Sequence, residues 1–280
     1  PEVQALADYI GDSYFLSKKA TELANKTIVL CGVTFMGESA KLLNPDKTVL
    51  MPDLAADCPM AHMITADRIA EVREEYEDLA VVCYVNSTAE IKAVSDVCVT
   101  SSKAVKVVSN IPQKNIFFVP DNNLGRYVAE KLPEKHFIFH DGFCHVHKSI
   151  HAAELQAAKD ACPDALVLTH PECTEDVVAM SDFVGSTSEI IDFATQSDCK
   201  KFIICTEMGV FFELQQKNPD KKFYSVGHRQ FCPNMKKVTI DKVEQVLEKL
   251  GSGELEEITL SDEILTRAAK PLQRMLELAK

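Results

Sequence analysis

Three cysteines stand at equivalent positions of an internal repeat, and their side chains suit metal binding. The repeat starts at an aspartate, in the segments ADYIGDS (Asp8), SDVCVTS (Asp96) and SDFVGST (Asp182). A hydroxyl residue follows five positions later, and a cysteine follows that hydroxyl after 45, 43 and 45 residues, at Cys58, Cys144 and Cys232. One thiol per repeat in an equivalent loop would bring three sulfur ligands to one centre.

The spacing of these cysteines excludes the common metal-binding patterns. None of the three belongs to a CxxC pair, so the spacings of zinc fingers and ferredoxins are not met. Thiolates select soft metals, and three sulfurs would leave one iron of a 4Fe–4S cluster open for a substrate atom. The alternative is that three buried thiols share a position through duplication alone.

The hydroxyl residues of the repeat are candidates for binding an anion. They follow strand ends and precede amphipathic helical patterns, at Ser13, Ser101 and Thr187. A helix N-terminus offers free N–H groups and a positive dipole end, which can hold a carboxylate or a phosphate. The alternative is ordinary N-capping, which is the usual role of these residue types. Three equivalent positions favour a ligand with several negative groups.

Two predicted strands end in polar residues, YVN at 84–86 and HPE at 170–172. Ligands of parallel sheets bind beyond the carboxyl ends of the strands. Tyr84 would act as an acid or hydrogen-bond donor, and His170 with Glu172 as proton-transfer partners. Asn86 would bind a carboxylate. Metal binding by the three histidines near Cys144 (His145, His147 and His151) is disfavoured, because a sulfur cluster would crowd them.

Short β-branched runs alternate with amphipathic helical patterns, which indicates parallel sheets covered by helices. Expected helices include 13–25, 36–43, 66–78, 101–108, 187–196 and a final helix over 262–278, interrupted at Pro271. We therefore expect an α/β fold of three similar three-layer α/β/α domains around a pseudo-threefold axis. The expected domains are residues 1–80, 81–163 and 164–250, followed by a C-terminal helical extension over 251–280.

The repeat predicts an incomplete sheet in the first domain. In the second repeat, Tyr84 and Asn86 lie 12 and 10 positions before Asp96. In the third repeat, His170 and Glu172 lie at the same distances before Asp182. Counting 12 residues back from Asp8 passes the start of the chain. We therefore expect the opening strand of the first repeat, with its polar strand-end residues, to lie upstream of Pro1.

Composition narrows the class of protein. The chain has 280 residues and a formal net charge of −12, with no basic stripe to neutralise phosphates, so nucleic-acid binding is not expected. No apolar run is long enough to span a bilayer, and no signal peptide is visible. Several of the ten cysteines lie inside apolar strand patterns, where thiols are small buried hydrophobes. These features favour a reducing cytoplasm.

The ordered motifs along the whole chain resemble the quinolinate synthase (NadA) family. The resemblance rests on GDS at 11–13, GVTFMGE at 32–38, the stretch from LNPDKTVLMPD to Cys58-Pro-Met, and YVNSTAE at 84–90. It continues through TSS at 100–102, PDNNLG at 120–125, Cys144 with His147, HPEC at 170–173, GST at 185–187, TEMG at 206–209 and CPNMKK at 232–237.

This resemblance implies a reaction, a cofactor and a set of site residues. Iminoaspartate and dihydroxyacetone phosphate would condense to quinolinate with loss of phosphate and two waters, in NAD biosynthesis and functionally linked to L-aspartate oxidase. A 4Fe–4S cluster would act as Lewis acid, with Glu172 as general base. Cluster ligands would be Cys58, Cys144 and Cys232. Substrate-binding residues would be Ser13, Tyr84, Val85, Asn86, Ser101, His170, Pro171, Glu172 and Thr187.

Two other functions share part of this pattern. The radical enzyme of diphthamide synthesis also places one cysteine in each of three α/β domains around a cluster, but the YVN and HPE strand ends with three hydroxyls suit small diacids better. An iron–sulfur sensor would carry a basic nucleic-acid module, and the sequence offers none.

Overall fold

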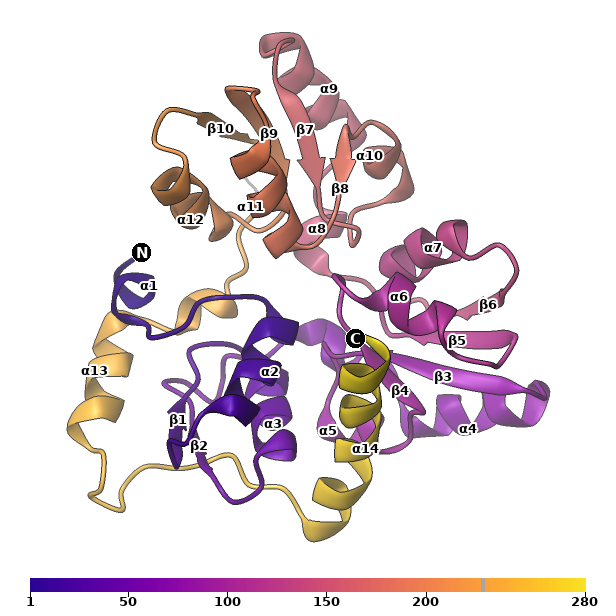
Figure 1. The fold of residues 1–280 in the computed structure, drawn as a ribbon, viewed down its shortest axis with the longest axis vertical. Coiled ribbons are helices and arrows are strands. Elements are labelled where there is room, and N and C mark those ends of the chain that lie inside the picture. Colours follow the sequence, from indigo (N-terminus) through magenta and orange to yellow (C-terminus); the bar gives the residue numbers. More distant parts are fainter. Residues whose placement is uncertain (228–229) are drawn as a thin grey trace.

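The protein is an α/β structure whose named strands pair in parallel in three separate sheets. The computed structural model describes residues 1–227 and 230–280. Figure 1 shows the three sheets, each with its helices, as three groups arranged around the middle of the view. We call each sheet, with the chain that runs to the start of the next sheet, the first, second and third unit.

The first unit contains two described strands, β1 (Thr27–Val29) and β2 (Thr48–Leu50). Its helices are α1 (Glu2–Leu6), α2 (Ser13–Glu22), α3 (Thr34–Leu43), the 3₁₀ turn η1 (Pro59–His62) and α4 (Ala66–Glu75). The other two sheets have four strands each. The first sheet is therefore incomplete relative to the others within the described residues, as the repeat leads us to expect.

The second and third sheets have the same strand order, with the first strand of each unit between the second and the third. The second sheet runs β4 (Val97–Val99), β3 (Leu79–Tyr84), β5 (Asn115–Val119) and β6 (His136–Phe139). The third runs β8 (Phe183–Val184), β7 (Leu166–Thr169), β9 (Lys201–Cys205) and β10 (Lys222–Ser225).

Helices connect these strands. The second unit contains α5 (Ala89–Ala93), α6 (Ala104–Ser109), α7 (Asn122–Lys131), α8 (His145–Lys148) and α9 (Ala152–Ala161). The third contains α10 (Glu175–Ala179), α11 (Thr187–Gln196), α12 (Val210–Lys217), η2 (Met235–Lys237) and α13 (Ile240–Glu248). Parallel strands require such crossovers because consecutive strands must run in the same direction. The last helix of each unit lies beside another unit's sheet: α4 beside β3, α9 beside β7 and α13 beside β1 and β2 (Figure 1).

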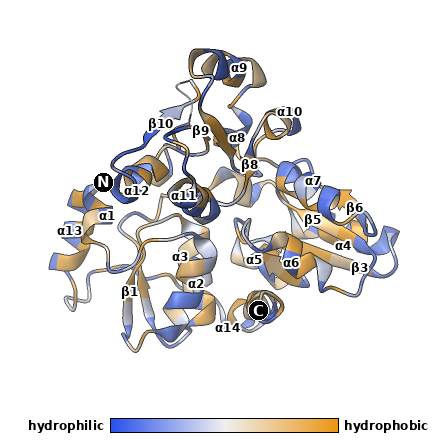
Figure 2. Cartoon of the chain, turned by 45° about the horizontal axis from the view of Figure 1, so that its top comes forward, coloured by the Kyte–Doolittle hydropathy of each residue, from blue (hydrophilic) through white to orange (hydrophobic). Residues whose placement is uncertain are grey.

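The strands of the third sheet are apolar on both faces because helices cover both. Val167 and Ile203 belong to a cluster with Leu155 of α9, whereas Leu168 and Phe202 belong to a cluster on the α11 and α12 side. Figure 2 shows β9 as strongly hydrophobic between helices of mixed character. This is the three-layer arrangement that continuous hydrophobic strands predict.

The repeated aspartates have a structural role in two of the three units. The Asp96 carboxylate accepts a hydrogen bond from the backbone N–H of Val81 (2.7 Å), and Asp182 accepts one from Val167 (2.7 Å). Each carboxylate thus ties a turn before the second strand to the first strand of its unit. Asp8 is exposed, and no strand of this kind lies beside it among the described residues.

In each unit, a lysine side chain caps the C-terminal end of one helix. The side chains donate hydrogen bonds to carbonyl groups at or just beyond the C-terminal ends of α2, α6 and α11, from Lys47, Lys135 and Lys221. A cation at the C-terminus of a helix satisfies free carbonyls and opposes the helix dipole. All three units therefore use the same local device, whereas their relation by a common threefold axis stays a prediction.

The C-terminal helix α14 (Asp262–Leu278) packs on α3 of the first unit and on α5 and β4 of the second. The expected interruption at Pro271 is wrong, because α14 is continuous through this residue. Proline removes only one helical hydrogen bond. The buried face formed by Ala268, Pro271, Leu272 and Met275 keeps the helix in place. The domain boundaries themselves stay a prediction.

Within the described parts of the chain, every helix is too short or too polar to cross a membrane.

Replacing Asp182 by alanine should lower the free energy of unfolding by about 1 kcal/mol, because the Val167 N–H loses its acceptor. Asp8→Ala is the matched control at the same repeat position and should change stability by less than about 0.5 kcal/mol. Urea unfolding measures both. Equal destabilisation by the two substitutions would contradict the assigned role of Asp182.

Candidate active site

A cavity of about 780 Å³ is lined by side chains from all three units. The carboxyl ends of β3 and β7 contribute Tyr84, Asn86, His170 and Glu172 to it. Parallel strands bring their carboxyl ends to one edge of a sheet, so polar residues that follow them gather there. The cavity therefore has the position expected for a substrate site.

All three repeat cysteines line this cavity. Cys58 directly precedes η1, Cys144 directly precedes α8, and Cys232 lies three residues before η2. Burial raises the pKa of Cys58 to about 12, and burial together with the negative charge of Glu172 raises the pKa of Cys144 well above its usual value. All three cysteines thus border one cavity, and their role as ligands of one metal group stays a prediction.

Each of these cysteines donates its backbone N–H to a carboxyl group. Cys58 donates to Asp57 (2.7 Å), Cys144 to Asp121 (3.2 Å) and Cys232 to Glu207 (3.3 Å). Asp121 and Glu207 each stand two residues after the third strand of their unit. Asp57 and Glu207 line the cavity themselves, whereas Asp121 does not.

Asp121 is fully buried and also caps α7, accepting from the N–H of Leu124 (2.8 Å). Burial and the charge of Glu172 raise the pKa of Asp121 well above its usual value. Asp57 is more exposed and pairs with His62 (2.5 Å), and Glu207 pairs with Lys236 (3.0 Å). Asp121 and Glu207 thus hold their cysteine loops from equivalent positions after a third strand, whereas Asp57 is the residue directly before Cys58.

The buried carboxylate of Glu172 is the centre of a hydrogen-bond network. Tyr84 donates its hydroxyl to Oε1 (2.6 Å), and Nδ1 of His147 lies 3.1 Å from Oε2. Burial alone would raise the pKa of Glu172, but His147, His170 and the hydrogen bonds from His147 and Tyr84 lower it to about 2. Burial raises the pKa of Tyr84 well above its usual value, with Glu172 adding to the effect. The network holds an ionised carboxylate and a protonated phenol.

His147 joins Glu172 to the third unit. Its Nε2 lies 2.9 Å from the hydroxyl of Thr206, and its ring stacks on that of His170 with centroids 4.6 Å apart. Burial lowers the pKa of His170 to about 3, so this ring is neutral at pH 7. The backbone N–H of Glu172 donates to Nδ1 of His170 (3.3 Å), which assigns the remaining proton of His170 to Nε2.

His170 and Glu172 are less directly paired than we expected from the sequence. Nδ1 of His170 lies 3.7 Å from the Glu172 carboxylate, whereas Tyr84 and His147 are in hydrogen-bond contact with it. The sequence placed His170 and Glu172 on one strand face, but both follow the end of β7, where the strand alternation no longer applies.

The repeat hydroxyls lie at the cavity but do not cap their helices. Ser13 and Thr187 are the first residues of α2 and α11, and their neighbours Asp12 and Ser186 accept the capping hydrogen bonds. Ser101 lies in a turn three residues before α6, which begins later than expected from the sequence. Because other side chains provide the two caps, the hydroxyls of Ser13 and Thr187 are available to a ligand.

Seven of the nine expected substrate-binding residues line the cavity: Ser13, Tyr84, Asn86, Ser101, His170, Glu172 and Thr187. Val85 and Pro171 are buried but do not line it. The side-chain oxygen of Asn86 is buried without a hydrogen-bond partner among the described residues. A buried polar atom without a partner is costly, and here it faces a ligand-sized space.

The sequence argument missed the role of His147. It disfavoured metal binding by the histidines after Cys144 as a group, although only His145 and His147 line the cavity. A spacing of three residues from Cys144 places His147 one helical turn away, which was the available signal. Thr206, the partner of His147, comes from a strand end 59 residues later, and only the resemblance through TEMG at 206–209 pointed to it.

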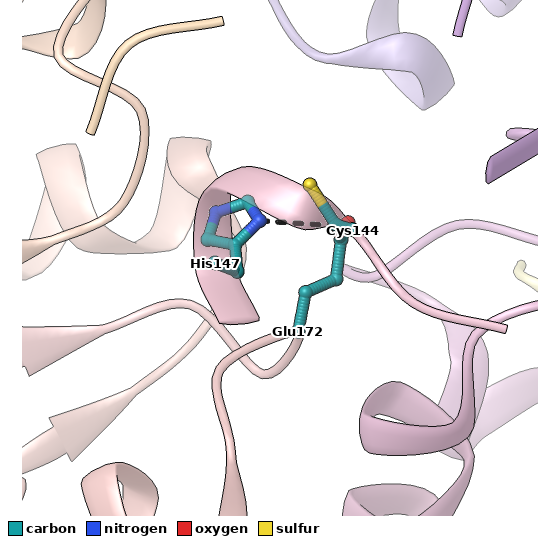
Figure 3. A group of neighbouring side chains, drawn as sticks. All are labelled: Cys144, His147 and Glu172. Atoms are coloured by element: carbon teal, nitrogen blue, oxygen red, sulfur yellow. Dashed lines mark hydrogen bonds and ion pairs between the residues drawn. The ribbon is translucent and has the colours of Figure 1, made fainter. Parts of the chain in front are cut away.

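Figure 3 shows Cys144, His147 and Glu172 as neighbours, with the ring nitrogen of His147 directed at the carboxylate. Ligand atoms of these three residues all lie within 4.8 Å of one another. Thiolate, imidazole and carboxylate are all ligands of transition metals.

The family model described as "Quinolinate synthetase A protein" matches residues 1–277. The chain belongs to this family. It is 51% identical to a quinolinate synthase of Fusobacterium nucleatum over 278 residues, which cover 99% of this chain and 91% of that protein. It is 47% identical to the quinolinate synthase of Clostridioides difficile over 280 residues, covering 100% of this chain and 91% of the relative.

The quinolinate synthase of Caldicellulosiruptor saccharolyticus is 49% identical over 278 residues, covering 99% of this chain and 90% of that protein. The similarity therefore extends over all three units. The resemblance inferred from the sequence motifs is confirmed.

Replacing Asp121 by alanine should lower the free energy of unfolding by about 2 kcal/mol, because the N–H groups of Leu124 and Cys144 lose their acceptor. The two N–H groups bind different carboxylate oxygens, and Asp121→Asn keeps only one acceptor, so it should recover at most half of this loss. Chemical denaturation of the metal-free protein measures the difference. Unchanged stability of Asp121→Ala would show that the Cys144 loop is held by other contacts.

Proposed function

We propose that this protein is a quinolinate synthase, condensing iminoaspartate with dihydroxyacetone phosphate with loss of phosphate and two waters. The observation that carries the proposal is one cavity lined by the three repeat cysteines, from three units, and by the Tyr84–Glu172–His147 network. Membership in the quinolinate synthetase A family and relatives that bear the name quinolinate synthase support it. The proposal includes a functional link to L-aspartate oxidase and a cytoplasmic location.

Cys58, Cys144 and Cys232 would hold a 4Fe–4S cluster. The donor set fits such a group, because the three repeat cysteines line one space and thiolates select soft metals. Cys31 also lines the cavity but has no counterpart in the repeat. When bound, the cluster would supply a Lewis acid through the iron that lacks a protein ligand. The carboxyl groups of Asp57, Asp121 and Glu207 would keep the cysteine loops in place before the cluster enters.

The substrates carry carboxylate and phosphate groups, and the chain offers hydroxyls and helix N-termini to hold them. Ser13 and Thr187 start two helices of ten residues each, where free N–H groups and the helix dipole favour negative charge. Ser101 and Asn86 would complete the binding from the second unit. Val85 and Pro171 would act by fixing the backbone beside Asn86 and Glu172, since their side chains do not line the cavity.

Proton transfer would pass through Glu172. With a pKa of about 2 the carboxylate is ionised but a weak base, because Tyr84 and His147 stabilise its charge. A substrate that takes the place of either donor would remove that stabilisation and make Glu172 more basic. Tyr84 would orient the carboxylate through the existing 2.6 Å hydrogen bond and so aid proton movement through Glu172, while its raised pKa keeps the phenol protonated. The neutral His170 would donate through Nε2.

The proposal predicts about four irons per chain after anaerobic reconstitution. Replacing Cys58, Cys144 or Cys232 by serine should abolish the cluster, because each supplies one of only three thiolates. Cys83→Ser is the control, since Cys83 is a buried strand residue that does not line the cavity. Counts of iron and sulfide, with a quinolinate assay, measure the result. If Cys83→Ser loses as much iron as the variants of the three repeat cysteines, the assignment of these cysteines as cluster ligands is contradicted.

Glu172→Gln should lower turnover roughly 10²–10⁴-fold, the usual contribution of a general acid–base group. Affinity for a substrate analogue should change far less, because the amide keeps the shape of the side chain. Ser101→Ala and Thr187→Ala should have the opposite pattern, with binding weakened by about 1 kcal/mol. Steady-state kinetics of the three variants separates the effects. Near-normal turnover of Glu172→Gln would leave Tyr84 or His170 as the base.

A further inference from the structure

Cys144, His147 and Glu172 form a ligand group that differs from the three cysteines of the repeat. Their ligand atoms lie within 4.8 Å of one another, and Nδ1 of His147 is 3.1 Å from Oε2 of Glu172. Only Cys144 belongs to both groups. His147 and Glu172 are buried, so their nitrogen and oxygen atoms are shielded from bulk water.

The distances suit a small divalent cation. Zinc binds thiolate sulfur at about 2.3 Å and nitrogen or carboxylate oxygen at about 2.0–2.2 Å. Tetrahedral coordination at such distances separates neighbouring ligand atoms by about 3.3–3.7 Å. The nitrogen and oxygen, 3.1 Å apart, would need to separate by a few tenths of an ångström, and the sulfur would need to move by about 1 Å at most.

Each of the three residues also has a second contact that would orient it. Thr206 lies beside the other ring nitrogen of His147 (2.9 Å), Tyr84 donates to the other oxygen of Glu172 (2.6 Å), and Asp121 accepts from the backbone N–H of Cys144 (3.2 Å). Supporting contacts of this kind fix the ring orientation and hold ligands in metal sites. The fourth coordination position would open to the cavity, which all three residues line.

We infer that Cys144, His147 and Glu172 form a mononuclear zinc-type site that excludes the cluster. Zn²⁺ would enter between Nδ1 and the carboxylate. The thiol proton of Cys144 would pass to solvent, and His147 would exchange its proton on Nδ1 for one on Nε2, where Thr206 accepts it. A single thiol cannot serve both metal groups, so zinc loading would block cluster insertion. The site itself does not depend on the proposed function.

Cobalt is the probe for this site, because a thiolate bound to tetrahedral Co²⁺ gives a sulfur-to-metal charge-transfer absorption. The metal-free full-length protein should bind one Co²⁺ per chain, and Zn²⁺ should displace it. Cys144→Ser should abolish the charge-transfer band, and His147→Gln should weaken Co²⁺ binding at least 10-fold. Cys58→Ser and Cys232→Ser are the matched controls and should keep the band with unchanged affinity.

The controls separate this inference from the cluster proposal. If Cys58→Ser or Cys232→Ser loses Co²⁺ binding as Cys144→Ser does, the metal lies among the three cysteines and the inference is overturned. Absence of Co²⁺ binding by the unaltered chain also overturns it. Circular dichroism verifies that each variant is folded. If Cys144→Ser does not fold, Glu172→Gln and His147→Gln decide, and undiminished binding in both contradicts the site.

A second measurement connects the site to iron. Protein preloaded with one Zn²⁺ per chain should take up at least 10-fold less iron and sulfide, and His147→Gln should restore uptake. Only this iron-uptake experiment rests on the proposed function; the cobalt experiment does not. If the unaltered chain takes up no cluster even without zinc, the proposed function fails while the cobalt result still stands. If zinc leaves cluster uptake unchanged, the claimed exclusion fails.

Discussion

The buried charge of Glu172 is the interaction on which the arrangement of the site depends. A carboxylate removed from water costs several kcal/mol unless hydrogen bonds replace its hydration. Tyr84 and His147 provide these bonds, and they come from different segments of the second unit. Thr206 then fixes His147 from the third unit. The carboxylate therefore couples the strand ends of two units, and loss of any partner would leave a buried polar group unpaired.

The three units share the hydrogen bonds that hold their backbone, but they differ in the side chains that face the cavity. Lysines close equivalent helices in all three units, and carboxyl groups hold the N–H of all three cysteines. The strand ends differ: the second unit places Tyr84 and Asn86 where the third places His170 and Glu172. The same fold thus presents a phenol and an amide from one side and an imidazole and a carboxylate from the other.

Cys144 has a special position among the three cysteines because it borders both the other thiols and the Glu172 network. The imidazole and carboxylate of the network are good ligands for a single hard or borderline cation. If the three repeat thiols hold the proposed cluster, the metal that reaches Cys144 first would decide which group forms. The chemistry of the donor atoms, rather than any difference in fold, separates the two outcomes.

The sequence by itself determined the local elements and the candidate residues. Continuous apolar strands predicted buried parallel sheets, and the period of 86 to 88 residues located the cysteines and hydroxyls that line the cavity. Only the tertiary structure decided that Tyr84 bonds Glu172 across 88 residues, that His147 joins them, and that α14 continues through Pro271. Periodicity reports which face of an element is buried. It carries no information on which polar groups meet between units, because those contacts depend on how separate sheets pack.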